Sequence, residues 1–185
     1  MRFKSLRKIA ILTVSLTLLK AQSLENILKS YENGQYWKSC SLCQKSINLY
    51  KKSDEFLNFC ALSCLKANEL EKMASFAFLL KKTPADRKNS IYFLTILYQK
   101  ELLFHSILDG KDISFVKIPK TNYILSDIFV RYVKNDYIKK GKVYIFPDKK
   151  NPDIFYKLSI EKMGDKRKLF LRTFKGKILL KTRIY

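Results

Sequence analysis

The apolar residues of this chain change their spacing partway along its 185 positions. Up to about residue 110 they recur at intervals of three and four, which is typical of amphipathic helices. From about residue 142 they alternate with polar residues, which is typical of strands with one buried face. We therefore expect an α+β fold, with N-terminal α-helical hairpins followed by a helix and a four-stranded antiparallel β-meander.

The clearest helix start in the first part is the segment Thr83-Pro84-Ala85-Asp86. It has a capping residue, a proline at the first helical position and an acid in the first turn. The helix that follows is expected to continue through residues 91–98. A separate short helix is expected over residues 102–108, closed by Gly110.

The segment YENGQYWKSC, residues 31–40, resembles a tetratricopeptide (TPR) repeat. Three of its positions are matched 34 residues later, with Gly34 matching Asn68, Trp37 matching Glu71 and Cys40 matching Ala74. The resemblance covers roughly residues 24–108, as two to three repeats, and implies stacked hairpins with a concave protein-binding face. A generic bundle of helical hairpins remains the alternative. We expect Trp37 to fill a junction between helices.

The second part carries one more helical pattern and then four alternating segments. The helical pattern covers residues 123–140 and ends at Gly141. The four expected strands are residues 142–146, 154–161, 169–174 and 178–184. Short turns between them predict an antiparallel meander. Within the second strand, Tyr156 and Leu158 should point to one side, and Phe155 and Lys157 to the other.

Four cysteines occur in two pairs, Cys40 with Cys43 and Cys60 with Cys64. Each pair has a spacing that places both residues on one face of a helix. A short link joins the two expected helices, so they should be antiparallel, and facing residues should then have a constant sum of residue numbers. This condition selects two disulfides, Cys40–Cys64 and Cys43–Cys60. An even number of cysteines in an exported chain favours disulfides.

Three other functions of these cysteines stay open. A site with four thiolates could bind zinc. The Cys40–Cys43 motif could carry redox chemistry, although it lacks the βαβ context of thioredoxin-like enzymes. Haem attachment requires a histidine after the second cysteine, and Gln44 occupies that position. We expect a structural pair of disulfides, with no metal and no cofactor.

The first 23 residues have the pattern of a secretory signal peptide. Four bases precede an apolar run, residues 9–19, and the small residues Ala21 and Ser23 fit a cleavage site before Leu24. The run is about half as long as a membrane-spanning helix requires. We expect an exported protein, periplasmic in a bacterium, with secretion or an N-terminal membrane anchor as alternatives.

The positive charge is concentrated towards the C-terminus. The whole chain has a net charge of +21, and residues 111–185 contain 20 basic and 7 acidic residues. Such a field attracts polyanions and anionic surfaces, although a solvated lysine-rich face is the simpler interpretation. We expect three cations on the strands, Lys157, Arg172 and Lys181, to form part of any polyanion-binding surface.

Residue patterns that would indicate a catalytic site are missing from the sequence. The single histidine, His105, lies in an apolar helical stretch, and the five glycines form no phosphate-binding loop. We therefore expect a protein that is not an enzyme. The first hypothesis is a scaffold or adaptor that binds a protein partner in the cell envelope. The alternatives are a polyanion binder, for DNA during uptake or for an anionic lipid or glycolipid, and a thiol–disulfide enzyme.

These observations predict three segments. Residues 1–23 are the signal peptide, residues 24–110 a helical-hairpin domain with two disulfides, and residues 111–185 a basic module with one helix and an antiparallel sheet.

Overall fold

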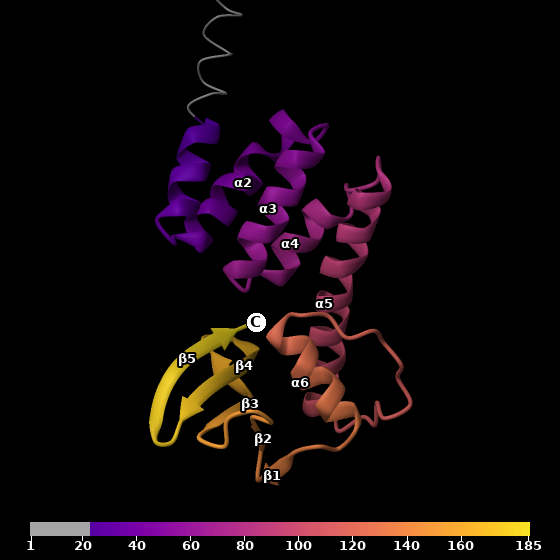
Figure 1. The fold of residues 1–185 in the computed structure, drawn as a ribbon, viewed down its shortest axis with the longest axis vertical. Helices are drawn as coiled ribbons and strands as arrows, with labels where there is room; N and C mark the ends of the chain where they lie inside the picture. Colours follow the sequence, from indigo (N-terminus) through magenta and orange to yellow (C-terminus); the bar gives the residue numbers. More distant parts are fainter. Residues whose placement is uncertain (1–22) are drawn as a thin grey trace, which may run out of the picture. The chain divides into compact units, whose positions relative to one another are not determined.

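A computed structural model describes residues 23–185 of the chain (Figure 1). The predicted signal peptide lies outside these described residues, apart from Ser23. The chain divides into two compact units, Met1–Asn89 (unit 1) and Ser90–Tyr185 (unit 2). This division falls inside helix α5, Pro84–Asp109, and so precedes the boundary expected near residue 110.

Unit 1 is built from short helices joined by tight turns. In its described part a helix over residues 23–32 is followed by three more helices and the first turn of α5. The three helices are α2 (Tyr36–Tyr50), α3 (Asp54–Lys66) and α4 (Leu70–Ala77). The N-terminus of α3 is capped by Ser53, whose side chain accepts a hydrogen bond from the Phe56 N–H.

The two turns that the tetratricopeptide resemblance aligns have the same backbone geometry. Gly34 and Asn68 both have a positive φ, of 70° and 62°. In each turn the next N–H bonds back to the carbonyl five residues earlier, which closes the helix end. Asn135, at the end of the later helix α6 (Ile124–Val133), has the same geometry, so the turn is not specific to a repeat. The helical hairpins are present, and the tetratricopeptide assignment is not confirmed.

Helix α5 begins where the sequence predicts. The N–H and hydroxyl of Thr83 both donate to the Asp86 carboxylate, and the Asp86 N–H donates to the Thr83 hydroxyl. The two bonds that Thr83 donates to the carboxylate lower the pKa of Asp86, and the bond from the hydroxyl has the larger effect. The expectation of a separate helix over residues 102–108 was wrong, because α5 continues without a break to Asp109. Neither glycine nor proline interrupts it before Gly110, which has a φ of +67°.

Unit 2 contains the rest of α5, helix α6 and a five-stranded antiparallel sheet, so the expectation of four strands was wrong. The additional strand β1 (Ile138–Lys140) occupies the end of the segment that was expected to be helical, residues 123–140. Asn135, with a φ of 56°, ends the helix early because asparagine tolerates the left-handed conformation. The other strands are β2 (Val143–Pro147), β3 (Ile154–Met163), β4 (Lys166–Lys175) and β5 (Ile178–Ile184).

The strands follow one another in chain order, each hydrogen-bonded to the next. Tyr144, Leu158 and Leu171 are direct cross-strand partners and share one side of the sheet, which we call the helix-side face. Lys157 and Arg172 pair on the other side, which we call the opposite face. This confirms the alternation predicted for β3.

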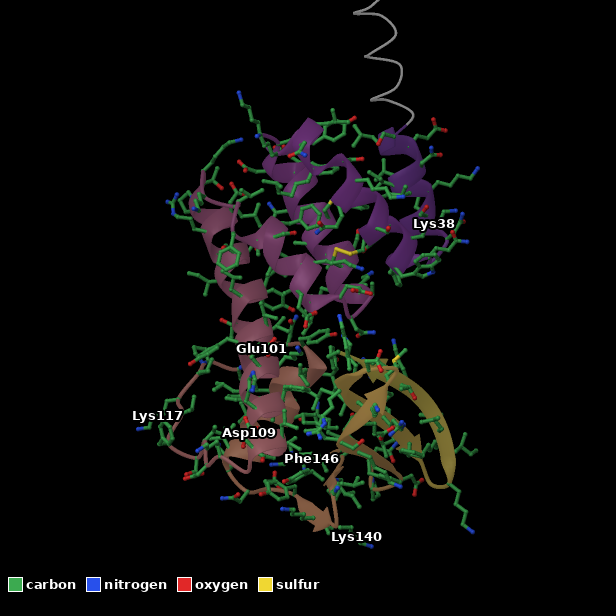
Figure 2. The ribbon with its side chains drawn as sticks, turned by 180° about the vertical axis from the view of Figure 1, so that it is seen from behind. Lys38, Glu101, Asp109, Lys117, Lys140 and Phe146 are labelled. Carbon is green, nitrogen blue, oxygen red and sulfur yellow. A yellow bond between two sulfur atoms is a disulfide. The ribbon has the colours of Figure 1, made fainter. Side chains whose placement is uncertain are left out.

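The helix-side face of the sheet packs against α6, which lies beside the sheet in Figure 1. Tyr132 of α6 contacts Tyr144, with ring centroids 5.2 Å apart, and Arg131 donates to the Pro147 carbonyl at 2.7 Å. Phe146, labelled in Figure 2, is fully buried. The chain ends at the buried Tyr185, whose backbone forms two hydrogen bonds with Leu169. Burial raises the pKa of Tyr185 well above its ordinary value.

Candidate functional site

All four cysteines form disulfides between α2 and α3. The pairs are Cys40–Cys64 and Cys43–Cys60, which is the pairing that the antiparallel register predicts. Figure 2 draws disulfide bonds in yellow among the helices of unit 1. All four side chains are fully buried. A catalytic cysteine needs an accessible sulfur atom, so this burial favours the structural role over thiol–disulfide exchange.

Two of the three predicted polyanion-binding residues lie together. Lys157 and Arg172 are cross-strand partners on the opposite face of the sheet. The Lys157 ammonium lies 4.7 Å from the centre of the Phe174 ring, and this ring stacks on Phe155. The Arg172 guanidinium lies 4.8 Å from the centre of the Phe170 ring. Cations and aromatic rings are therefore interleaved on this face.

The charge of Arg172 is already paired within the protein. Its guanidinium donates two hydrogen bonds to the Glu161 carboxylate, one of them at 2.7 Å. Ser159 donates a third hydrogen bond to the same carboxylate. These bonds, with Arg172 the largest cause, lower the pKa of Glu161 from 4.5 to about 2. Arg172 would therefore have to leave a strong partner before it could bind an external anion.

Lys181 lies apart from the other two residues. It pairs with Thr173, and Thr173 pairs with Tyr156, so this row belongs to the helix-side face. The residue opposite Arg172 on β5 is Thr182. A register shift between Thr173 and Phe174 interrupts the alternation of β5, and such a shift is not visible in the sequence pattern. The structure therefore does not bring Lys181 together with Lys157 and Arg172.

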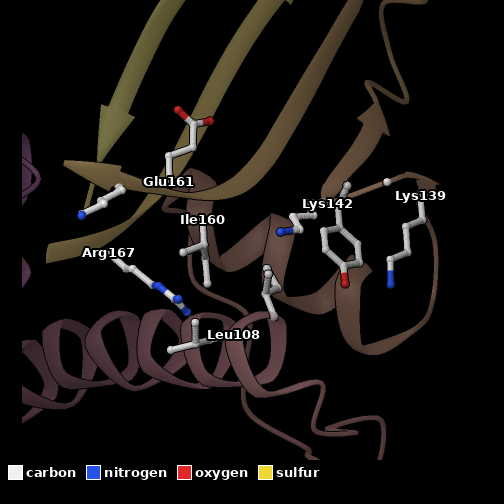
Figure 3. A pocket seen from close by; sticks show the side chains of 10 residues that line it. Leu108, Lys139, Lys142, Ile160, Glu161 and Arg167 are labelled. Carbon is white, nitrogen blue, oxygen red and sulfur yellow. The ribbon is translucent and has the colours of Figure 1, made fainter.

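A second group of cations surrounds a cavity of about 330 Å³ in unit 2 (Figure 3). The four basic residues that line it are Lys139, Lys142, Lys162 and Arg167. Two turns of the sheet position them. Lys139 and Lys142 flank the turn between β1 and β2, while Lys162 and Arg167 are cross-strand partners beside the turn between β3 and β4. We call these four residues the cavity cluster.

The walls of this cavity include both polar and apolar groups. Tyr144 contributes its ring, and the Lys139 ammonium lies 5.3 Å from the centre of that ring. The end of α5 contributes Ile107 and Leu108. Figure 3 shows Arg167 pointing towards Leu108.

Within the part of the chain that the structure describes, no member of the cavity cluster forms an ion pair. The one acid in the cavity lining is Glu161, which is paired with Arg172. In Figure 3 its carboxylate points away from the other labelled side chains. Four cations thus surround a space that can hold an anionic group, without a carboxylate of the cavity lining to neutralise them.

Sequence reasoning did not select the cavity cluster. Its signal was present as two lysine-rich turns, residues 139–142 and 162–168. The turns are about 20 residues apart in the sequence, and only the pairing of β2 with β3 brings them together. The alternation of residues along the strands instead predicted Lys157, Arg172 and Lys181 as binding residues.

The structure also shows the surroundings of Trp37 and His105, two residues that the sequence analysis singled out. Trp37 has 69% of its surface exposed, so the expectation that it fills a helix junction was wrong. His105 is exposed on α5, with Glu101 and Asp109 at 3.7 and 3.6 Å. Among residues 23–185, no three side chains of histidine, cysteine, aspartate or glutamate come close enough together to hold a metal ion.

None of the helices in the described part of the chain is both long enough and apolar enough to cross a membrane. The two disulfides are typical of proteins that function in an oxidising compartment outside the cytoplasm. No family model, curated protein or solved structure matches the chain.

Proposed function

We propose that this chain is an exported, non-enzymatic protein whose unit 2 binds a phosphate-bearing polyanion, such as DNA during uptake, at the cavity cluster. The observation that carries this proposal is the gathering of four cations without an acidic partner around one cavity of about 330 Å³. Unit 1 is the disulfide-stabilised helical part of the same protein.

The chemistry of the cavity fits a phosphate group attached to a less polar body. Lysine and arginine side chains bind phosphate oxygens by charge-assisted hydrogen bonds. Tyr144 and Leu108 offer an aromatic ring and an aliphatic wall to the rest of the ligand. The net charge of unit 2, with 21 basic and 9 acidic residues, would attract a polyanion from a distance.

The test is binding of fluorescent single-stranded DNA, duplex DNA and inorganic polyphosphate to the protein isolated from expressing cells, followed by anisotropy at low salt. A quadruple variant replaces the cavity cluster with serine: Lys139→Ser, Lys142→Ser, Lys162→Ser and Arg167→Ser. Because these cations would contact phosphate, affinity should fall by about tenfold or more for at least one probe.

The matched control removes the same charge from unit 1. It replaces four exposed lysines of unit 1 with serine: Lys29, Lys38, Lys45 and Lys51. If the cavity cluster is the site, this variant should bind within about twofold of the wild type. Equal losses in the two quadruple variants would show that net charge alone determines binding, and the proposal would then fail.

A scaffold that binds a protein partner through unit 1 is the second candidate, and the exposed Trp37 is the observation that favours it. Tryptophan is enriched among the residues that dominate the energetics of protein interfaces. Leu28 and Leu49 are also about half exposed in the same unit. If the hairpins stack like tetratricopeptide repeats, their concave face would provide the surface for such a partner.

The scaffold function is tested by chemical cross-linking in the cell envelope, with Trp37→Ser as the matched variant. A partner that is cross-linked to the wild type and lost from the variant supports a protein interface at Trp37. Identical cross-linked species from both proteins would contradict it.

A further inference from the structure

The hairpin that joins β4 to β5 ends in a run of exposed aliphatic side chains. Ile178, Leu179 and Leu180 have 67%, 50% and 53% of their surfaces exposed. Successive residues of a strand point to opposite faces of the sheet. The exposed side chains of this run therefore lie on both faces. No other element of unit 2 therefore covers this tip on either side.

Cations surround these three aliphatic residues. Lys175 precedes the turn, Lys177 lies within it, and Lys181 follows the run. All three are exposed, and none forms an ion pair with any residue from 23 to 185. Next to the turn, the backbone carbonyl of Asp153 accepts a hydrogen bond from the Gly176 N–H.

Two stacked aromatic rings form the base of the tip. Phe155 and Phe174 stack as cross-strand partners, with ring planes 5° apart and centroids separated by 5.2 Å. The Lys157 ammonium lies over both rings, at 5.5 and 4.7 Å from their centres. The register shift between Thr173 and Phe174 leaves Leu180 without a direct cross-strand partner. The aliphatic residues of the tip therefore lie next to a paired aromatic base.

We propose that this hairpin tip inserts into the surface of an anionic lipid bilayer. Aliphatic side chains ringed by lysines match the two layers of such a surface, because the apolar groups can enter the acyl boundary while the ammonium groups remain among the anionic headgroups. The tip and the cavity cluster are at opposite ends of β4, about 30 Å apart for a ten-residue strand. The inference is therefore independent of polyanion binding at the cavity.

A second copy of the chain fits this surface less well. Pairing of two β5 edges would bring Lys177, Lys181 and Arg183 of one copy near the same residues of the other, and β5 contains no acid. Like charges placed across a strand pair are destabilising. A bilayer with anionic headgroups instead provides the opposite charge.

The first experiment is co-sedimentation of the protein, as isolated from expressing cells, with phosphatidylcholine vesicles that contain or lack phosphatidylglycerol. The test variant carries Ile178→Ser, Leu179→Ser and Leu180→Ser. We expect the wild type to bind the phosphatidylglycerol vesicles, and the variant to bind about tenfold less tightly or worse. Phe115→Ser is the matched control, since this apolar residue lies outside the tip and is even more exposed, at 76%. It should bind like the wild type.

A second variant reports on the tip directly. Trp37 is the only tryptophan, so Trp37→Phe combined with Leu179→Trp leaves one indole at the tip. Its fluorescence should shift to the blue with phosphatidylglycerol vesicles and stay unchanged with phosphatidylcholine alone. Replacement of Lys175, Lys177 and Lys181 by serine should weaken binding and remove its sensitivity to salt.

Three results would overturn the proposal. They are the absence of wild-type binding to phosphatidylglycerol vesicles, equal binding by the triple variant, and an indole at the tip that does not respond to vesicles. A dimer in sedimentation analysis without lipid, abolished by the triple variant, would assign the tip to a second copy. Circular dichroism and thermal melting of each variant test whether the fold is intact. If it is, a loss of binding can be assigned to the substituted residues of the tip.

Discussion

The two units of this protein differ in what stabilises each of them internally. In unit 1 two disulfides join α2 to α3, and the described residues 23–89 carry 11 basic and 7 acidic side chains. Unit 2 contains no cysteine and carries 21 basic and 9 acidic residues around a core of aromatic and aliphatic side chains. Covalent stabilisation and most of the positive charge are therefore separated between the two units. The unit without cross-links carries the larger share of the cations.

The largest effect is expected from the core of unit 2. Phe146 is fully buried, and it contacts Tyr137 and the Arg131 guanidinium. Phe146→Ala should lower the free energy of unfolding of unit 2 by about 3–5 kcal/mol, because it leaves a cavity that the sheet cannot close. Hydrogen exchange of peptides from residues 138–185 measures this.

The matched control for Phe146→Ala is Phe115→Ala, since Phe115 is 76% exposed. That variant should stay within about 0.5 kcal/mol of the wild type. Faster exchange of peptides from residues 36–66 in Phe146→Ala would show that the two units unfold together, which would contradict the comparison.

The next effect concerns unit 1. Replacement of Cys40 and Cys64 by alanine removes the outer of two nested disulfides and should destabilise unit 1 by about 2–3 kcal/mol in the chain-entropy account, because Cys43–Cys60 still joins α2 to α3. Unit 2 should be unaffected, since none of its residues is cross-linked. Hydrogen exchange, with and without a reducing agent, follows both units at once.

Reduction of the wild type provides the control for this experiment. It should accelerate exchange in peptides from residues 36–66 and leave those from residues 138–185 unchanged. If reduction accelerated hydrogen exchange equally in both units, the separation of covalent stabilisation from charge would not hold.

A smaller effect is expected from the ion pair between Arg172 and Glu161. Glu161→Gln should cost unit 2 about 1 kcal/mol at neutral pH, a value reduced because the carboxylate is 40% exposed. The folded pKa of Glu161 is about 2, below its ordinary 4.5. The contribution of the carboxylate is therefore complete above pH 4.5, decreases as the pH falls below 4.5, and disappears near pH 2.

Urea unfolding of the wild type and Glu161→Gln between neutral and acidic pH measures this window. The stability difference should shrink as the pH falls. The matched variant is Asp165→Asn, which removes an exposed acid in the turn between β3 and β4. A constant difference across the range would contradict the assigned ion pair.

The smallest effect on stability is expected at Trp37. Because most of its surface is exposed, Trp37→Ala should change the stability of unit 1 by less than about 0.5 kcal/mol. Thermal melting of the variant beside Leu57→Ala, which removes a fully buried side chain of α3, gives the contrast. A large loss at Trp37 would restore the role in helix packing that the sequence suggested.

The sequence was sufficient to predict features that depend on local spacing. The disulfide pairing followed from the positions of the cysteines on two consecutive antiparallel helices. The start of α5 followed from Thr83 and Asp86, and four of the five strands from alternation. These features need only neighbouring residues or one short turn.

Features that depend on tertiary pairing could not be predicted in this way. Strand β1 exists because Ile138 pairs with Ile145, although its residues continue a helical pattern. Charge counting identified the basic part of the chain but not which cations are unpaired. Arg172 is held by Glu161, whereas Lys142 and Arg167 come from separate turns and share one cavity.

We propose that the cavity cluster, and not the net charge of the chain, binds a polyanion. The most direct test is the slope of log affinity against log salt for single-stranded DNA. Loss of four phosphate contacts should flatten the slope by up to about 3 in the variant that replaces Lys139, Lys142, Lys162 and Arg167. The charge-matched variant of unit 1 should keep the wild-type slope. Identical slopes in both quadruple variants, or a wild-type slope near zero, would contradict the account.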